Sequence, residues 1–278
     1  MGKQDIINGA EEYATYITSR ISQRSQDNKI LYYFSGSLAM LLLSSAKNIA
    51  FIGANNDGDV SFISPQISVS PEAKNSFKKG VRPLSMDIDL VAIDDSTFAG
   101  NGKHYVLSKI RENCHLATEL CPSWARNEGT MYFDILSDER QIVNHNIAGI
   151  ELENGQRILI VNPIDLMLHK LSESIYLQTK PKSAEKYEKD VKDLACLLGG
   201  IISLGIIPEN FEEYINEVLN NNPTSSISKN FVVNHEGELS KLAEDLKSHT
   251  DKQLYKKVKQ VLSVIIKFNK EKSQSQPQ

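Results

Sequence analysis

The sequence predicts an α/β (α+β) protein in which a mixed sheet flanked by helices is followed by a C-terminal helical bundle. Short apolar runs with strand character recur up to residue 161 and alternate with segments of helical composition. After Pro163 the chain turns to consecutive segments of helical periodicity. Amphipathic helices must bury their apolar stripes, so we expect an α/β domain at 1–162 and a helical bundle at 163–270.

The elements of the α/β domain follow from local patterns. An amphipathic helix is expected at 4–24, where apolar residues recur at spacings of three and four. An aromatic-rich strand at 30–34 leads through Ser35-Gly36-Ser37 into a helix at 37–46. The stretch 53–80 is rich in Gly, Asn, Ser and Pro, which predicts hairpin or loop. Further strands are expected at 86–93, 130–136 and 157–161.

Glycine, proline and capping residues mark the helices of the bundle. Pro163 suits a first helical position, and Asn162 can cap it. Gly199-Gly200 is expected to stop the second helix, and Thr250 to cap the last. The predicted helices are 163–178, 184–198, 209–220, 237–248 and 251–269. Residues 271–278 are expected to form a disordered tail.

Composition narrows the class of protein. A chain with 40% hydrophobic and 24% charged residues is ordinary for a soluble protein. Its net charge of −4 gives no global nucleic-acid signature, so an RNA partner would need a local basic patch. Three scattered cysteines fit a reducing cytoplasm. Without a signal-peptide pattern or a bilayer-length apolar run, we expect a cytoplasmic protein with no membrane partner.

Two carboxylates, Asp87 and Asp89, stand two residues apart in the predicted strand 86–93. Side chains alternate across a strand, so both belong to one face. Neighbouring carboxylates repel unless a cation lies between them, and hard oxygen ligands suit Mg²⁺ or Mn²⁺. The pair therefore predicts metal-assisted phosphoryl or nucleotidyl transfer.

Gly36 and Ser37 stand at the predicted strand-to-helix turn upstream of this pair. Glycine lets the backbone approach a phosphate closely, serine adds a hydroxyl, and free N–H groups at a helix start attract anions. Gly36 and Ser37 are therefore candidate nucleotide-binding residues.

Asp134 lies among apolar residues in the predicted strand 130–136. A lone acid in a buried strand is costly unless it is paired or bound to a metal. Asp134 either completes a metal site with Asp87 and Asp89 or forms a structural ion pair with Arg82 or Arg126.

These residues resemble the nucleotidyltransferase superfamily of DNA polymerase beta, and the fuller pattern resembles its AbiEii branch. That branch contains the toxins of type IV toxin–antitoxin and phage-abortive-infection systems. The resemblance runs through Arg82, Ser85 and Asp87-Ile88-Asp89-Leu90, with one extra residue after the arginine. It covers most of the chain, in the same order of motifs. The distance from Ser37 to Asp87 is longer than in compact members, which implies an insertion at 44–80.

The resemblance also assigns roles in the helical bundle. It implies that Lys170, on the helix after the last strand, contacts a triphosphate, and that Asp190 or Asp193 orients Lys170 or contacts the nucleotide. Two other interpretations stay open. Lys170 is a lysine that extends from the helix surface to solvent. Asp190 and Asp193 share one face of a charge-rich helix, as a solvated edge with nearby lysines as partners. Those lysines are Lys186, Lys189 and Lys192.

The function implied is transfer of a nucleoside monophosphate from an NTP to an acceptor hydroxyl. The catalytic residues would be Asp87, Asp89, Asp134 and Lys170, with Mg²⁺ or Mn²⁺ as cofactor. The resemblance implies RNA such as tRNA, or a protein, as acceptor and a cognate antitoxin as partner. Two alternatives remain: a catalytically degenerate fold that only binds a nucleotide or a protein, and a helical interaction module.

Other chemistry-bearing residues predict less. The group His104, Cys114, His115 and Cys121 has no standard zinc-ligand spacing, and adjacent Cys114 and His115 hinder shared ligation, so we interpret it as core or surface. Trp124 is interpreted as a packing residue that could otherwise stack on a base.

Overall fold

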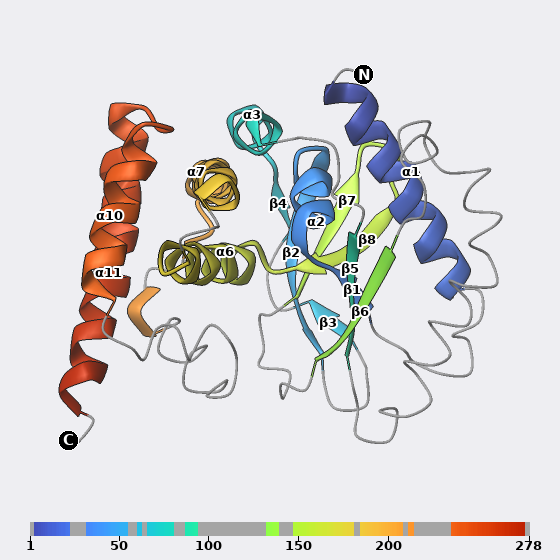
Figure 1. The fold of residues 1–278 in the computed structure, drawn as a ribbon. Helices are drawn as coiled ribbons and strands as arrows, with labels where there is room; N and C mark the ends of the chain where they lie inside the picture. Colours follow the sequence, from blue (N-terminus) through green and yellow to red (C-terminus); the bar gives the residue numbers. More distant parts are fainter. Residues whose placement is uncertain are drawn as a thin grey trace. The chain divides into compact units, whose positions relative to one another are not determined.

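The computed structural model of the chain describes residues 3–22, 32–54, 60–62, 66–80, 87–93, 132–138, 147–180, 184–207, 211–213 and 235–275. These residues form two compact units, Met1–Asn162 and Pro163–Gln278. The N-terminal unit holds a mixed sheet with helices, and the described part of the C-terminal unit is helical (Figure 1). The mixed α/β class predicted from the sequence is therefore confirmed.

The N-terminal unit contains three described helices and eight described strands. The helices are α1 (Lys3–Ser22), α2 (Gly36–Leu43) and α3 (Pro71–Lys79). The strands are β1 (Tyr32–Phe34), β2 (Ala46–Ala54), β3 (Val60–Phe62), β4 (Ile67–Ser68), β5 (Asp87–Ile93), β6 (Tyr132–Asp138), β7 (Ile147–Leu152) and β8 (Arg157–Val161).

The strands form one sheet in the order β3-β2-β7-β8-β1-β5-β6, with β4 paired to β2. The β5–β6 and β1–β8 pairs are parallel, and the other described pairs are antiparallel. Helices α1 and α2 contact each other and pack on the sheet, α1 at β8 and α2 at β5 (Figure 1). The short β1 therefore lies between β8 and β5, and its carboxyl end leads directly into α2.

The segment 53–80, which we predicted as hairpin or loop, contains the antiparallel β2–β3 pair of a hairpin and, in addition, helix α3. Strand β2 pairs with β7 from Ala46 to Ile52, so the predicted insertion begins with an internal strand of the sheet. Helix α3 starts where the Ser70 side chain accepts a hydrogen bond from the Ala73 N–H, and Pro71 occupies the first turn. Strand β7, which we did not predict, forms a hairpin with β8 that turns at Gly155, where φ is 81°.

The C-terminal unit contains α6 (Pro163–Gln178), α7 (Ala184–Leu204), α10 (Glu236–Lys247), α11 (Lys252–Ser275) and a helical stretch at 211–213. Helix α6 packs on α7, and α10 contacts α6, α7 and α11. The buried side of α11 includes Val258 and Ile265, each 0% exposed. The apolar residues whose periodicity predicted these helices therefore lie on the side of the helix that packs.

Three predicted helix ends are wrong. Gly199 and Gly200 are buried inside α7, which ends at Leu204 before Gly205, whose φ is 66°. A glycine with positive φ is a common helix terminator, and the sequence pattern did not show which glycine took that role. Asp251, not Thr250, caps α11, because its Oδ1 accepts hydrogen bonds from the N–H groups of Gln253 and Leu254. Helix α11 also extends to Ser275, inside the predicted tail.

No helix among the described residues is both long enough and apolar enough to cross a membrane.

Candidate functional site

The turn between β1 and α2 contains a left-handed residue. Ser35 is extended, with φ −127°, and Gly36 follows with φ 58°. A residue with a Cβ would cost about 1–2 kcal/mol at such a φ, and glycine avoids that cost. The Ser-Gly-Ser sequence therefore fits a sharp entry into α2, which begins at Gly36, one residue before the predicted start.

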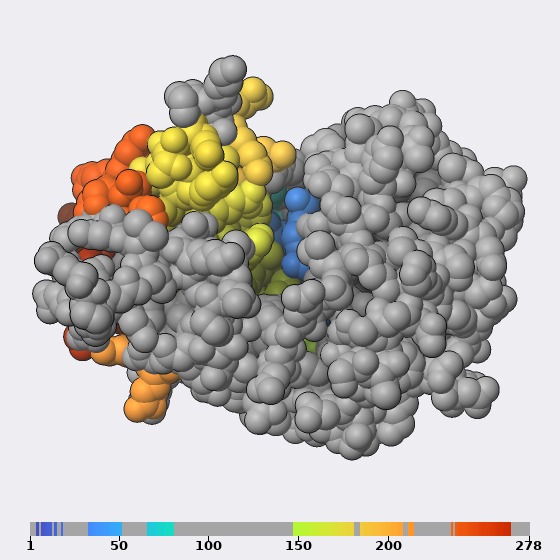
Figure 2. Space-filling model, turned by 60° about the horizontal axis from the view of Figure 1, so that its bottom comes forward, coloured from blue at the N-terminus to red at the C-terminus, as the bar shows by residue number. Residues whose placement is uncertain are grey.

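This turn is open to solvent within an otherwise buried segment. From Tyr33 to Ala46, every residue is buried except Ser35, Gly36 and Ser37. Atoms of the segment that contains β1 and α2 (blue) are visible at the molecular surface in Figure 2. The backbone bond from Ala39 N–H to the Ser35 carbonyl is 3.3 Å long, so the preceding N–H groups lie in the first helical turn, where helical partners are lacking. Such groups attract anions.

The acidic positions on β5 and β6 lie side by side in the backbone. Strands β5 and β6 run parallel, and Asp89 is paired with Asp134, while Asp87 is paired with Tyr132. Positions 87 and 89 share one face by strand alternation, and paired positions of neighbouring strands share a face. The three acidic positions therefore belong to one face of two adjacent strands.

The β1–α2 turn borders the same part of the sheet. Strand β1 runs antiparallel to β5, and its last residue, Phe34, is paired with Leu90. Leu90 directly follows Asp89, so the chain leaves β1 next to the start of β5. Neighbouring strands thus bring the Gly36 turn, the Asp-x-Asp segment and the Asp134 position to one region of the sheet.

Several predictions fall outside the described residues. The side chains of Asp87, Asp89 and Asp134 are among them, so their metal role stays a prediction. Where side chains are described, no group of three or more His, Cys, Asp or Glu could hold a metal ion. The remaining candidates outside the described residues are Arg82, His104, Cys114, His115, Cys121, Trp124 and Arg126.

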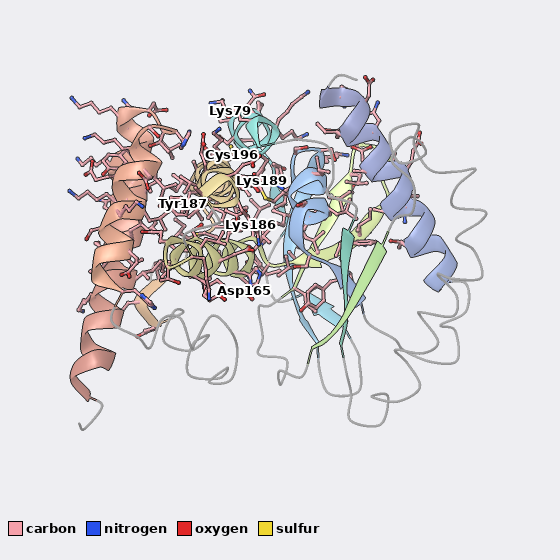
Figure 3. All side chains as sticks on the ribbon, viewed as in Figure 1. Lys79, Asp165, Lys186, Tyr187, Lys189 and Cys196 are labelled. Carbon is pink, nitrogen blue, oxygen red and sulfur yellow. The ribbon has the colours of Figure 1, made fainter. Side chains whose placement is uncertain are left out.

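The second group of candidate residues lies in the C-terminal unit, between α6 and α7. The Lys170 Nζ on α6 lies 3.1 Å from Asp190 Oδ1 on α7 and 3.3 Å from Glu173 Oε2. The Lys170 side chain is 11% exposed and that of Asp190 is 2% exposed. Lys186, on α7 and labelled in Figure 3, has its Nζ 2.5 Å from Glu173 Oε1. Lys170, Glu173, Lys186 and Asp190 thus form one network of ion pairs between α6 and α7.

This geometry corrects two of the interpretations that the sequence left open. Asp190 and Asp193 are only 2% and 3% exposed, so they are not a solvated acidic edge. Lys170 is largely buried and ion-paired, so it does not extend to solvent as a surface lysine. Lys186 pairs with Glu173, and Lys192 pairs with Glu188. Lys170 Nζ donates a hydrogen bond to Asp190 Oδ1, and the roles of Lys170, Asp190 and Asp193 at a nucleotide stay predictions.

The electrostatics of the cluster favour the charged forms of Lys170 and Glu173. Burial alone would lower the pKa of Lys170, but the carboxylates of Asp190, Glu173 and Asp193 outweigh it and raise that pKa. Burial would raise the pKa of Glu173, yet Lys170 and Lys186 lower it. Lys170 therefore keeps a positive charge at neutral pH in a position that is nearly closed to water.

Glu173 is the member of this cluster that our sequence analysis missed. It lies three residues after Lys170 on one helix, a spacing that brings side chains together, so the signal was present. Asp190, by contrast, reaches Lys170 only because α6 packs on α7, and no local pattern shows that contact.

Glu173→Gln should reduce the change in the free energy of unfolding between neutral and acidic pH. A carboxylate whose folded pKa is lowered stabilises the fold above its ordinary pKa of 4.5, and the contribution is lost as pH falls through the lower folded pKa. We expect a loss of about 1–2 kcal/mol at neutral pH that vanishes in acid. Urea denaturation across pH measures it, with Glu188→Gln as the control, because exposed Glu188 pairs with Lys192 at the surface. Equal losses in both variants would contradict the buried network.

Comparisons with protein-family models, curated proteins and solved structures gave no match to this chain.

Proposed function

We propose that the chain is a metal-dependent nucleotidyltransferase that moves a nucleoside monophosphate from an NTP to an acceptor hydroxyl. The supporting observation is the backbone register of β1, β5 and β6. Asp89 is paired with Asp134, Asp87 stands two positions away, and the Gly36 turn leaves β1 beside them. Phosphoryl chemistry needs clustered carboxylates next to backbone N–H groups that hold phosphate oxygens.

The donor set suits a hard divalent cation. Three carboxylate positions on adjacent strands offer only oxygen ligands, which Mg²⁺ and Mn²⁺ prefer. We assign Asp87, Asp89 and Asp134 as the ligands. The metal would supply positive charge against the triphosphate and favour loss of the acceptor hydroxyl proton.

Residues of the chain would bind the phosphates, neutralise their charge and accept the proton. The N–H groups around Gly36 and the Ser37 hydroxyl bind phosphate oxygens, and Lys170, held by Asp190, neutralises phosphate charge. The acceptor oxygen forms a bond to the α-phosphorus while the bond from that phosphorus to the leaving pyrophosphate breaks. Asp134 takes the hydroxyl proton. Positioning and charge neutralisation supply most of the rate enhancement.

The resemblance to AbiEii-type toxins adds an acceptor and a partner to the proposal. The acceptor would be RNA such as tRNA, or a protein, and a cognate antitoxin would oppose the activity. Full-length protein with each labelled NTP, Mg²⁺ and total RNA tests the chemistry, and labelled acceptor with released pyrophosphate is the expected result. Nucleotide binding without consumption of any NTP would favour the degenerate alternative.

Ser37→Ala should weaken NTP binding by about tenfold while changing the melting temperature little. The residue is partly exposed at the start of α2, so its hydroxyl contributes little packing, and one lost hydrogen bond to a charged group is worth about 1.5 kcal/mol. Calorimetry with an NTP analogue and thermal melting measure the two effects. Ser45→Ala is the contrasting control, because buried Ser45 donates to the Leu42 carbonyl at the end of α2 and should affect stability only. An unchanged affinity in Ser37→Ala would move the phosphate site elsewhere.

A further inference from the structure

The last helix concentrates positive charge in a chain that is acidic overall. Helix α11 carries seven lysines, one glutamate and no arginine. Its formal charge is therefore +6, in a chain of net charge −4, which leaves −10 for the other residues. A polyanion is repelled by most of the molecule and attracted to this helix.

Three of these lysines form a line. Lys252, Lys256 and Lys259 are spaced by four and three residues, which places them on one face of a helix, and all three are exposed. We call them the lysine stripe. It spans about 10 Å along the axis, a length over which a nucleic-acid duplex carries several phosphates. Nitrogen-tipped side chains extend from the side of α10 and α11 that faces away from α6 and α7 (Figure 3).

Acidic side chains of the described residues do not neutralise the lysine stripe. Among the described residues, none of its three members has an ion pair, whereas Lys267 on the same helix lies 2.7 Å from Glu212. Lys192 and Lys247 are likewise paired, with Glu188 and Glu244. Exposed lysines without acidic partners keep their charge available for a ligand.

We propose that the lysine stripe binds the phosphate backbone of an RNA, which then serves as the acceptor of the proposed transfer. Of the two acceptors considered, RNA or protein, only RNA is a polyanion along its whole length. The inference rests on the proposed function for this acceptor role, while the surface itself is argued from charge. Lysines act as point charges and read a backbone, whereas base recognition favours planar, bidentate side chains.

A membrane surface fits α11 less well. An amphipathic helix binds a bilayer by burying its apolar face in the lipid. In α11 that face is already packed inside the C-terminal unit, where Val258, Val261, Leu262 and Ile265 are at most 5% exposed. Only the charged side remains for a partner.

The test compares two triple variants of the full-length protein with the same net charge. The first replaces the lysine stripe: Lys252→Gln, Lys256→Gln and Lys259→Gln. The control replaces three ion-paired lysines: Lys192→Gln, Lys247→Gln and Lys267→Gln. Labelled single-stranded RNA of mixed sequence is titrated without NTP, and binding is followed by fluorescence anisotropy across a salt series.

The stripe variant should lose about tenfold or more in affinity, and its slope of log affinity against log salt should shrink by about 2, since each phosphate contact contributes roughly 0.7. The control should bind RNA nearly as wild type. Equal losses in both would show that net charge alone governs binding and would overturn the proposal, as would unchanged binding in the stripe variant. Tighter binding to DNA of the same sequence, or to phosphatidylserine vesicles, would overturn the assignment to RNA. Melting temperatures confirm that both variants fold.

The experiment separates this inference from the proposed function. The RNA titration contains no NTP, so its result does not depend on whether the chain transfers a nucleotide. Stripe-dependent RNA binding without transfer of any NTP would refute the nucleotidyltransferase and, with it, the acceptor role. If the stripe variant transferred nucleotide to RNA as well as wild type, only the assignment of the lysine stripe as the RNA-binding surface would be refuted.

Discussion

Asp87→Asn and Asp89→Asn should each reduce nucleotidyl transfer to background while leaving the fold intact or slightly more stable. The two positions share one face of β5, where like charges repel in the absence of a cation. An amide removes that repulsion but also removes a negative oxygen ligand, so activity and stability should change in opposite directions. Loss of one strongly stabilising group at a phosphoryl centre costs on the order of 100- to 1000-fold in rate, and losing a metal costs more.

Transfer assays and urea denaturation measure the two effects, and thermal melting with Mn²⁺ and an NTP analogue adds a readout other than activity. A ligand present at 100 times its dissociation constant stabilises the folded state by about 2.7 kcal/mol, so wild type should melt higher with both present. The melting temperature of Asp89→Asn should not rise when Mn²⁺ and the NTP analogue are added. Asp138→Asn is the matched control, because position 138 lies on β6 opposite Ile93, away from the paired Asp89 and Asp134.

Asp134→Asn distinguishes the metal role of that residue from the structural alternative. If Asp134 binds metal, the variant loses transfer and keeps its stability. If it instead forms an ion pair with Arg82 or Arg126, stability falls because a cation loses its partner. Substantial transfer in either Asp87→Asn or Asp89→Asn would refute the metal site on β5 and leave the degenerate alternative.

Strong local patterns predicted the elements that carry these positions. The apolar run around Asp87 gave β5 within one residue, and Asn162-Pro163 gave the first residue of α6. Besides β7, the sequence analysis did not predict β2 and α3, for different reasons. Strand β2 follows the leucine-rich helix α2 after a turn of only two residues, Ser44 and Ser45, without glycine or proline, so the start of β2 resembled a helix end. Helix α3 is short and buries only Ala73 and Phe77, which leaves a weak periodicity, although Ser70-Pro71 marked its start.

The register of the sheet is the part of the candidate site that the sequence could not supply. No local pattern shows that Asp89 pairs with Asp134, because the two residues are far apart in the sequence and strand pairing is a long-range property. The same limit applies to Lys170, whose helix was predicted correctly at 163–178. Its contact with Asp190 depends on how α6 packs on α7, which periodicity alone does not fix.

Lys170→Ala should lower transfer by on the order of 100-fold or more, because a cation that neutralises phosphate charge is lost. The structure adds a complication to this expectation. Removing the ammonium leaves Asp190, which is 2% exposed, without its partner, and breaking a buried pair costs about 3–5 kcal/mol. Loss of activity in this variant alone would therefore not separate a chemical role from a folding defect.

Two further variants make that separation. Lys170→Met with Asp190→Asn removes both charges, so the C-terminal unit should recover stability while transfer stays low. Lys170→Arg keeps a cation for Asp190 and Glu173 and should fold well. Its planar guanidinium does not replace a compact ammonium in a tight site, so transfer should recover only in part. Metal binding, by Mn²⁺ titration, should survive in all of these variants because the carboxylate positions lie in the other unit.

The geometry of Lys170 is what makes a phosphate contact chemically reasonable. An ammonium has three N–H donors, and among the described residues Asp190 and Glu173 accept from two of them. Counting the described residues, a third donor is left for a phosphate oxygen, and the raised pKa keeps the charge that the contact needs. Wild-type transfer in Lys170→Arg would show that only the ion pair matters, and that Lys170 acts by holding α6 and α7 together. NTP affinity that is unchanged in the Lys170→Met and Asp190→Asn double variant would exclude contact with the triphosphate.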